Sequence, residues 1–113
     1  MRVSLRSLNP EELEVVRKSI IEARRGLDWD YETRIGVAKE QCESLLEAWP
    51  NVDDSSDDSE VTVLVNNSLN DLLHGIGLSE HKIEERIGCS RDEMLKVYRK
   101  WATSRGWAST GVR

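Results

Sequence analysis

Apolar residues along this chain recur at intervals of three and four positions, the spacing at which side chains share one face of an α-helix. The pattern runs through most of the sequence and is interrupted by short polar breaks. It predicts an all-α fold of six helices, at about 10–25, 28–36, 39–49, 60–74, 80–87 and 91–104.

The breaks carry residues that start and stop helices. Asn9 and Pro10 are a strong start for the first helix, because asparagine caps the helix and proline needs no N–H in the first turn. Gly26 is suited to the end of the same helix. Ser90 and Glu93 have the spacing of a capping box, which predicts the start of the last helix.

The run 61–65 (VTVLV) is ambiguous, because its β-branched residues alone favour a strand. A longer window shows one continuous helical stripe. The stripe comprises Val61, Leu64, Val65, Ser68, Leu69, Leu72, Leu73 and Ile76. We therefore predict a helix capped by Ser59, in which Asn66 and Asn67 make a polar contact, since asparagine otherwise disfavours a helix interior.

Residues 31–49 recur without a gap at 83–101. The identical pairs are Glu32/Glu84, Arg34/Arg86, Ile35/Ile87, Gly36/Gly88 and Trp49/Trp101. Most other positions keep their apolar or polar character. Because such a repeat is typical of one supersecondary unit used twice, we predict two pseudo-repeated three-helix units that share one core. They span about 10–50 and 61–105 of a single domain, residues 1–113.

The remaining segments have simpler predicted roles. Residues 51–60 form an acidic linker between the units, and 106–113 a polar tail. Residues 1–8 alternate apolar and polar side chains, which leaves an edge strand and an extended arm both open. Within the repeat, each Arg is expected to form a salt bridge with the Glu two positions before it.

Composition adds expectations about what the protein lacks. Cys42 and Cys89 fall at apolar positions, so we expect reduced thiols and no disulfide. His74 and His81 lack a zinc spacing, and the acids of 51–60 lack the calcium-loop pattern. We therefore expect no metal, no cofactor and no enzymatic activity. No apolar run reaches the ~20 residues of a membrane span and no signal-peptide segment is present, so we expect a cytoplasmic protein.

The net charge of −5 conceals an asymmetry. Residues 1–60 contain 8 basic and 15 acidic residues, whereas residues from 91 onward contain 6 basic and 2 acidic ones. The acidic N-terminal half and the basic C-terminal end would suit two different partners, but such charges are also typical of an ordinary solvated surface.

The repeated motif resembles the helix-turn-helix class of DNA-binding motifs over about 20 residues in each unit. The resemblance rests on an apolar residue, a turn glycine, another apolar residue and a small one, followed by a second amphipathic helix. The matching sequences are Ile35-Gly36-Val37-Ala38 with Cys42 and Leu45, and Ile87-Gly88-Cys89-Ser90 with Met94 and Val97.

This resemblance implies that helices 39–49 and 91–104 would be the recognition helices. The first has an acidic exposed face, whereas the second is basic, and phosphate binding depends on Lys and Arg. The resemblance therefore makes double-stranded DNA a candidate partner for helix 91–104 only. The candidate contacts are Arg91, Lys96, Arg99, Lys100 and Arg105.

Protein docking without nucleic acid is the alternative, since three-helix units also serve that role. Leu95 is the apolar residue that helix 91–104 is expected to expose to a protein partner. The chain itself is expected to be a monomer or a homodimer.

Overall fold

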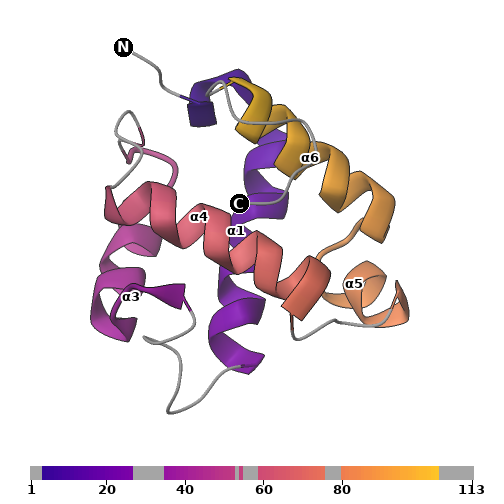
Figure 1. Ribbon diagram of the computed structural model, residues 1–113, viewed down its shortest axis with the longest axis horizontal. Coiled ribbons are helices and arrows are strands. Elements are labelled where there is room, and N and C mark those ends of the chain that lie inside the picture. Colours follow the sequence, from indigo (N-terminus) through magenta and orange to yellow (C-terminus); the bar gives the residue numbers. More distant parts are fainter. Residues whose placement is uncertain (1–3, 27–34, 53, 55–58, 76–79, 105–113) are drawn as a thin grey trace.

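The computed structural model describes residues 4–26, 35–52, 54, 59–75 and 80–104 (Figure 1). Within these ranges the chain is helical and contains no strand, which confirms the all-α prediction. Five α-helices are described: α1 (Pro10–Gly26), α3 (Lys39–Ala48), α4 (Glu60–Asn70), α5 (Glu80–Arg86) and α6 (Arg91–Ser104). Two short elements accompany them, the 3-10 turn η1 (Ser4–Ser7) and the π-helical segment η2 (Asp71–Gly75), which continues α4.

Five of the six predicted helices are therefore present in the part of the chain that the structure describes. The remaining predicted helix, 28–36, falls mostly on residues 27–34, outside the described ranges. The polar tail and Arg105 also lie outside them.

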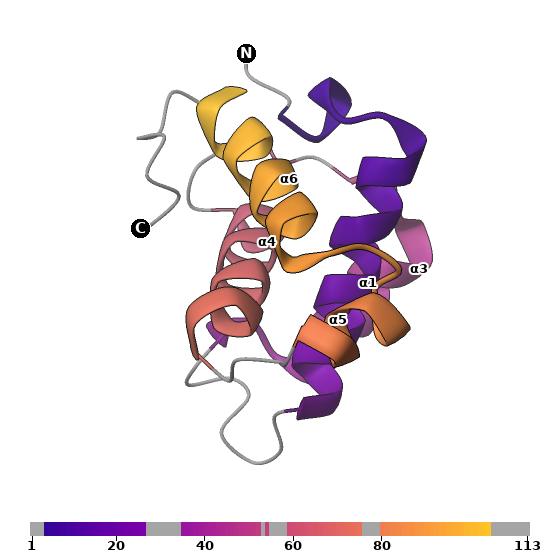
Figure 2. The ribbon, with the colours of Figure 1, turned by 90° about the vertical axis from the view of Figure 1, so that its right-hand side faces the viewer.

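Helices α1 and α4 form the centre of the molecule and make the most extensive contact between any two elements. Figures 1 and 2 show α3 beside one end of this pair and α5 and α6 beside the other. Val16 and Ile20 of α1 and Leu64 and Leu69 of α4 are fully buried, as the helical stripes predict. The strand alternative for 61–65 is excluded, because the stripe buries its apolar side chains only when wound as a helix.

Helix α6 completes the core with the apolar stripe that the repeat predicted. Its buried residues are Met94, Val97, Tyr98, Trp101 and Ala102. The matching stripe of α3 is less buried, because Cys42 is enclosed whereas Leu45, Leu46 and Trp49 are only half-buried. The two helices therefore have similar patterns but different depths in the core.

Residues 4–8 adopt neither of the two conformations expected for the N-terminal segment, whose residues 1–3 lie outside the described ranges. Ser4–Ser7 form a 3-10 turn that packs on α6 and buries Leu5 and Leu8. The Leu5 N–H donates to Asp54 Oδ2 at 3.2 Å, and Trp101 Nε1 donates to the same oxygen at 2.9 Å. The fully buried Asp54 carboxylate thus gives the acidic segment a role in the core, in addition to the predicted one of spacing.

The predicted helix starts are confirmed by their hydrogen bonds. The Glu12 N–H donates to Asn9 Oδ1 at 2.8 Å, and the Asn9 N–H donates to Glu12 Oε1 at 2.9 Å. Ser90 and Glu93 make the same reciprocal pair of bonds at the start of α6. The Ser59 side chain accepts a hydrogen bond in the first turn of α4. These starts form as expected because each depends on residues only three positions apart.

Gly36 and Gly88 make the predicted turns, with φ values of +85° and +88°. Only glycine adopts this left-handed backbone without strain. The predicted polar contacts of α4 are also present, since Asn67 Nδ2 donates to the Ile35 carbonyl at 2.7 Å and Asn66 Oδ1 accepts from Tyr98 Oη at 2.6 Å.

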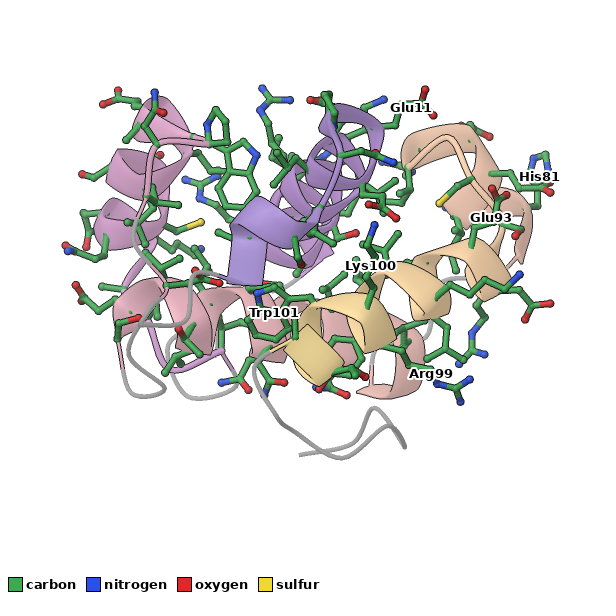
Figure 3. All side chains as sticks on the ribbon, turned by 90° about the horizontal axis from the view of Figure 1, so that it is seen from above. Glu11, His81, Glu93, Arg99, Lys100 and Trp101 are labelled. Carbon is green, nitrogen blue, oxygen red and sulfur yellow. The ribbon has the colours of Figure 1, made fainter. Side chains whose placement is uncertain are left out.

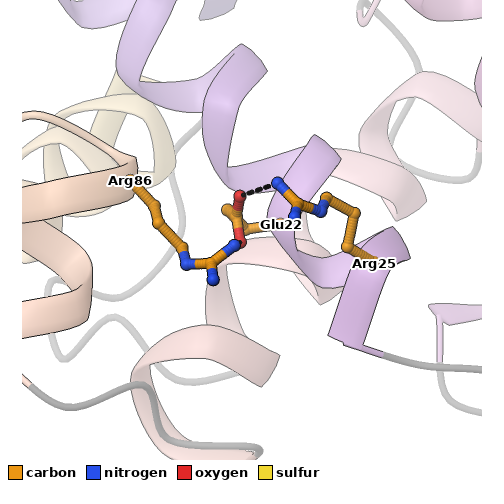
Figure 4. Close-up of polar contacts among 3 residues, drawn as sticks. All are labelled: Glu22, Arg25 and Arg86. Carbon is orange, nitrogen blue, oxygen red and sulfur yellow. Dashed lines mark hydrogen bonds and ion pairs between the residues drawn. The ribbon is translucent and has the colours of Figure 1, made fainter.

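The salt bridge predicted between Glu84 and Arg86 is wrong. Arg86 instead pairs with Glu22 of α1, with 3.4 Å between Nη1 and Oε2, and Glu22 also pairs with Arg25 at 3.2 Å (Figure 4). Residues two positions apart in a helix point in different directions, so exposed Glu84 cannot share a face with Arg86. The equivalent pair in the first unit, Glu32 and Arg34, lies outside the described residues.

Candidate functional site

Some of the cations predicted to contact DNA make contacts within the fold, whereas others are exposed at the surface. The Arg91 guanidinium donates to the Leu73 carbonyl and so ties the start of α6 to η2. Lys100 Nζ lies 2.7 Å from Glu12 Oε1, reaching from α6 to α1 (Figure 3). Lys96 and Arg99 are exposed, and no ion pair within the described part of the chain involves either.

Leu95, predicted as a docking residue, is half-buried and packs against the edge of the core. Its side chain is therefore committed in part to the fold. Lys96, Arg99 and Lys100 are all exposed on α6, but Lys100 is paired with α1, and the structure does not gather the three with Arg91 or Leu95 into one open patch.

An open groove lies between the first half of α1 and the segment that joins α5 to α6. Its volume is ≈ 550 Å³. It is lined by Asn9, Glu11, Glu12, Glu14, Val15, Lys18, Ile87, Gly88, Cys89, Glu93, Lys96 and Val97. Figure 3 looks onto this side of the molecule, with Glu11 on α1 and Glu93 on α6.

The floor of the groove is apolar and only partly covered. Ile87 and Val97 are buried within the core, whereas Val15 and Cys89 are half-buried beside them. Gly88 contributes no side chain, and a Cβ placed there would meet only Lys18 Nζ, at 3.8 Å.

The Glu12–Lys100 contact joins α1 and α6 beside the groove. Hydrogen bonding from Lys100 and then from the Asn9 N–H holds the pKa of Glu12 below its ordinary value of 4.5, against the opposing effect of burial. Glu12 therefore both caps α1 and links it to α6.

The other lining carboxylates differ in their contacts. Glu14 pairs with Arg17 at 2.8 Å, and Glu93 accepts from the Ser90 N–H at 3.2 Å. For Glu11, Lys18 and Lys96, neither an ion pair nor a side-chain hydrogen bond occurs within the described residues. Among the described residues, the groove thus presents two cations, Lys18 and Lys96, and two anions, Glu11 and Glu93, without an ion-pair partner.

The described residues hold no group of three or more His, Cys, Asp or Glu side chains arranged to bind a metal ion. Cys42 and Cys89 are both in the thiol form, the first enclosed in the core and the second beside the groove. Among the described helices, none has the length and apolar character needed to cross a membrane.

Sequence reasoning missed the groove because its two walls come from segments about 75 residues apart, and nothing in the pattern pairs α1 with α6. A weak local signal existed. Glu11, Val15 and Lys18 lie at the i, i+4, i+7 spacing of one helix face, and this face is separate from the stripe that enters the core.

No protein-family model, curated protein or solved structure matches this chain. The chemistry of the groove and of α6 is therefore the basis for the function proposed below.

Proposed function

We propose that this chain is a small non-catalytic binding module that docks a segment of another protein in the groove between α1 and α6. The observation that carries the proposal is the half-buried apolar floor, with Val15 and Cys89 open to solvent between charged walls. A partner side chain placed there would remove the remaining apolar surface from water, which is the main source of docking energy.

The size of the groove fits a short segment better than a whole domain. A volume of ≈ 550 Å³ lies in the usual range of pockets that hold a few side chains. An amphipathic helix laid into an apolar groove is a common way to fill such a site. The walls are joined by the Glu12–Lys100 ion pair, so the site is largely formed before a partner arrives.

The proposal is tested by selecting binders from a random library of peptides of about 15 residues, long enough to form a helix. Cys89 then serves as a position for blocking the groove, because a bulky maleimide attached there would occupy the floor while Cys42 is protected by burial. Selected peptides are expected to bind the untreated protein and to lose most of their affinity after alkylation. The Cys89→Ala variant treated with the same reagent is the control.

Peptides that bind the alkylated and untreated proteins equally would contradict a docking site in the groove. The Arg99→Glu variant is a second control, because Arg99 lies on α6 but does not line the groove. Its affinity for a selected peptide is expected to match that of the unmodified protein.

Double-stranded DNA is the second candidate partner, and the specific support for it is the pair of exposed cations Lys96 and Arg99 on the helix that follows the Gly88 turn. Arg91 and Lys100 add less, because both contact other parts of the chain. Since each phosphate contact contributes about one unit to the salt dependence, this surface would bind DNA weakly and with a shallow salt slope.

Charge reversal separates the two candidates. DNA binding, followed by fluorescence anisotropy between roughly 50 and 200 mM salt, should disappear with Arg99→Glu and persist with Lys18→Ala. Groove docking should instead persist with Arg99→Glu and be weakened by alkylation of Cys89 in the floor. Absence of DNA binding at the lowest salt concentration would exclude the second candidate.

We also propose that the chain consists of two copies of one three-helix unit. Gly36 and Gly88 have nearly the same φ, and each precedes a helix with the same apolar spacing, which supports this proposal. Superposing α3 with its preceding turn on α6 with its own is the direct test.

A further inference from the structure

A line of hydrogen bonds runs from α6, across α4, to the turn that precedes α3. The Tyr98 hydroxyl donates to Asn66 Oδ1 at 2.6 Å, and Asn66 Nδ2 donates to Asn67 Oδ1 at 3.2 Å. Asn67 Nδ2 then donates to the Ile35 carbonyl at 2.7 Å, next to Gly36. We call Tyr98, Asn66, Asn67 and the Ile35 carbonyl the asparagine relay. It links the two halves of the chain through α4.

Each member of the relay fixes the orientation of the next. An asparagine amide has an accepting oxygen on one side and a donating nitrogen on the other. Asn70 Nδ2 donates to Tyr98 Oη at 3.0 Å and to Asn66 Oδ1 at 3.1 Å, so the Tyr98 hydroxyl hydrogen points toward Asn66. With its oxygen engaged in this way, Asn66 presents its nitrogen to Asn67, and Asn67 presents its nitrogen to Ile35. Reversing any one amide would place two donors or two acceptors against each other.

The relay ends at the turn that positions a lightly buried helix. Among the residues of α3, Cys42 alone is buried. The turn lies against α4, where a Cβ added to Gly36 would meet Val63 and Asn67 Nδ2 at 3.2 and 3.6 Å. Because few apolar groups hold α3 in place, the bond from Asn67 to the Ile35 carbonyl contributes directly to keeping the start of this helix on α4.

We propose that the asparagine relay couples α6 to α3, so that a change in the hydrogen bond made by Tyr98 alters how readily the start of α3 opens. Hydrogen bonds in a chain strengthen one another, and the loss of one leaves the next amide able to reverse. Coupling between distant elements requires an element with two arrangements, and the local opening of α3 supplies it. None of the relay residues lines the groove, so the coupling is independent of the proposed docking function.

The first test removes the hydroxyl at one end of the relay and measures opening at the other. Tyr98→Phe keeps the ring, which is fully buried. The reporter is the Cys42 amide, whose N–H donates to the Ala38 carbonyl at 2.9 Å in the first turn of α3. Native-state hydrogen exchange of this amide, measured by nuclear magnetic resonance in the full chain, should become at least about two-fold faster in the variant.

Val97→Ala is the matched control, because Val97 is the neighbouring buried residue of α6 and takes no part in the relay. It lowers the stability of the whole fold, so it measures how far global unfolding contributes to exchange of the Cys42 amide. Tyr98→Phe should accelerate this exchange more than Val97→Ala does. Exchange that is unchanged in Tyr98→Phe, or that is accelerated no more than in Val97→Ala, overturns the coupling.

A double-mutant cycle tests the coupling at equilibrium. Tyr98 and Asn67 are joined through Asn66, so Tyr98→Phe and Asn67→Ala remove two parts of one relay. Urea unfolding should give a combined change in the unfolding constant that is smaller than the product of the single changes by about two-fold or more. Tyr98→Phe with Ser44→Ala, which removes an exposed α3 hydroxyl outside the relay, should give the product. If the relay pair also gives the product, the coupling is overturned, and a contrary result in either test is sufficient.

Discussion

At the scale of single residues, Asp54 has a contact pattern that its surroundings in the sequence do not indicate. Its Oδ2 accepts from the Leu5 N–H and from Trp101 Nε1, and its carbonyl accepts from Thr62 Oγ1 at 3.3 Å. Asp54 therefore joins η1 and α6 through its carboxylate and α4 through its backbone carbonyl, at one buried point. Neighbouring acids give no pattern from which this one could be singled out.

We expect Asp54→Ala to destabilise the fold by about 2–4 kcal/mol, because two buried donors lose their acceptor at about 1–3 kcal/mol each while the burial of a charge is relieved. The measurement is urea unfolding followed by tryptophan fluorescence and circular dichroism. Glu47→Ala, on the exposed face of α3, is the control and should change stability by less than about 0.5 kcal/mol. Equal effects of the two substitutions would show that the Asp54 contacts do not stabilise the fold.

Glu12 gives the fold a defined dependence on pH. Its pKa is lowered in the folded state, first by the Lys100 hydrogen bond, so its stabilising effect is complete above the unfolded value of 4.5 and is lost as the pH falls toward the folded value. The difference in unfolding free energy between the natural chain and Glu12→Gln should therefore shrink as the solution is acidified. Urea unfolding of both proteins over a series of pH values below neutrality measures this difference in free energy.

Lys100→Met keeps the aliphatic stem and removes the charge. In this variant, titration of the Glu12 carboxyl carbon by nuclear magnetic resonance should show a pKa closer to 4.5. If the pKa of Glu12 does not change in this variant, the hydrogen bond from the Asn9 N–H alone lowers it.

Local residue contacts could be predicted from the sequence, whereas distant ones could not. The caps at Asn9 and Ser90 follow from residues three positions apart, and the polar contact of Asn66 was inferred from its low helix propensity. The partner of Arg86 was assigned wrongly, because Glu22 is 64 residues away and only the packing of α5 on α1 brings the two together.

At the scale of elements, the predicted helices correspond closely to the observed ones wherever the structure describes them. Helix α4 forms although its first residues are β-branched, because its continuous apolar stripe packs in the core against α1. Tertiary packing overrides local propensity here. The groove depends on how α1 and α6 pack together, and for that reason the candidate site was not predicted.

The two turn glycines differ in their surroundings, which leads to a prediction. Replacement by alanine requires a left-handed conformation at either position, at about 1–2 kcal/mol. At Gly36 the new Cβ would also lie 3.2 Å from Val63 Cγ1, whereas at Gly88 its nearest neighbour is the flexible end of Lys18. Gly36→Ala should therefore lower the unfolding free energy more than Gly88→Ala does, by urea denaturation. The reverse order would contradict the packing of the Gly36 turn on α4.

At the scale of the whole molecule, burial is unevenly distributed among the helices. Six residues of α4 are buried, whereas Cys42 alone is buried in α3, and α3 makes only minor contacts with the other described helices. Local opening requires less free energy where fewer apolar groups are enclosed.

Native-state hydrogen exchange should reflect this difference. Amides in the middle of α4 and α6 are expected to exchange only through global unfolding, whereas those of α3 should exchange through local opening with a smaller free energy. Comparing each exchange free energy with the unfolding free energy from urea tests the prediction. Equal values for α3 and α4 would show that α3 opens only with the rest of the fold.

The turns of the two repeated segments pack on helices that belong to opposite halves of the sequence. The Gly36 turn lies against α4, where Asn67 binds the Ile35 carbonyl, and the Gly88 turn lies beside Lys18 of α1. Two further contacts join the halves of the chain: Arg86 pairs with Glu22, and Asp54 accepts a hydrogen bond from Trp101. Each half of the chain thus supplies the surface on which the other half completes its fold.

Because each half of the chain packs on the other, we expect two separate fragments of the chain to assemble with each other. If the backbone were cut between residues 55 and 58, each fragment would contain the sequences of its helices but lack the surface on which they pack. We expect the separate fragments to have little helical circular dichroism and to recover it when mixed at equal concentrations. A helical signal in either fragment alone that does not change on mixing would contradict this interdependence. If the signal recovers on mixing, the two fragments can serve as a split protein whose assembly reports that two fusion partners are close together.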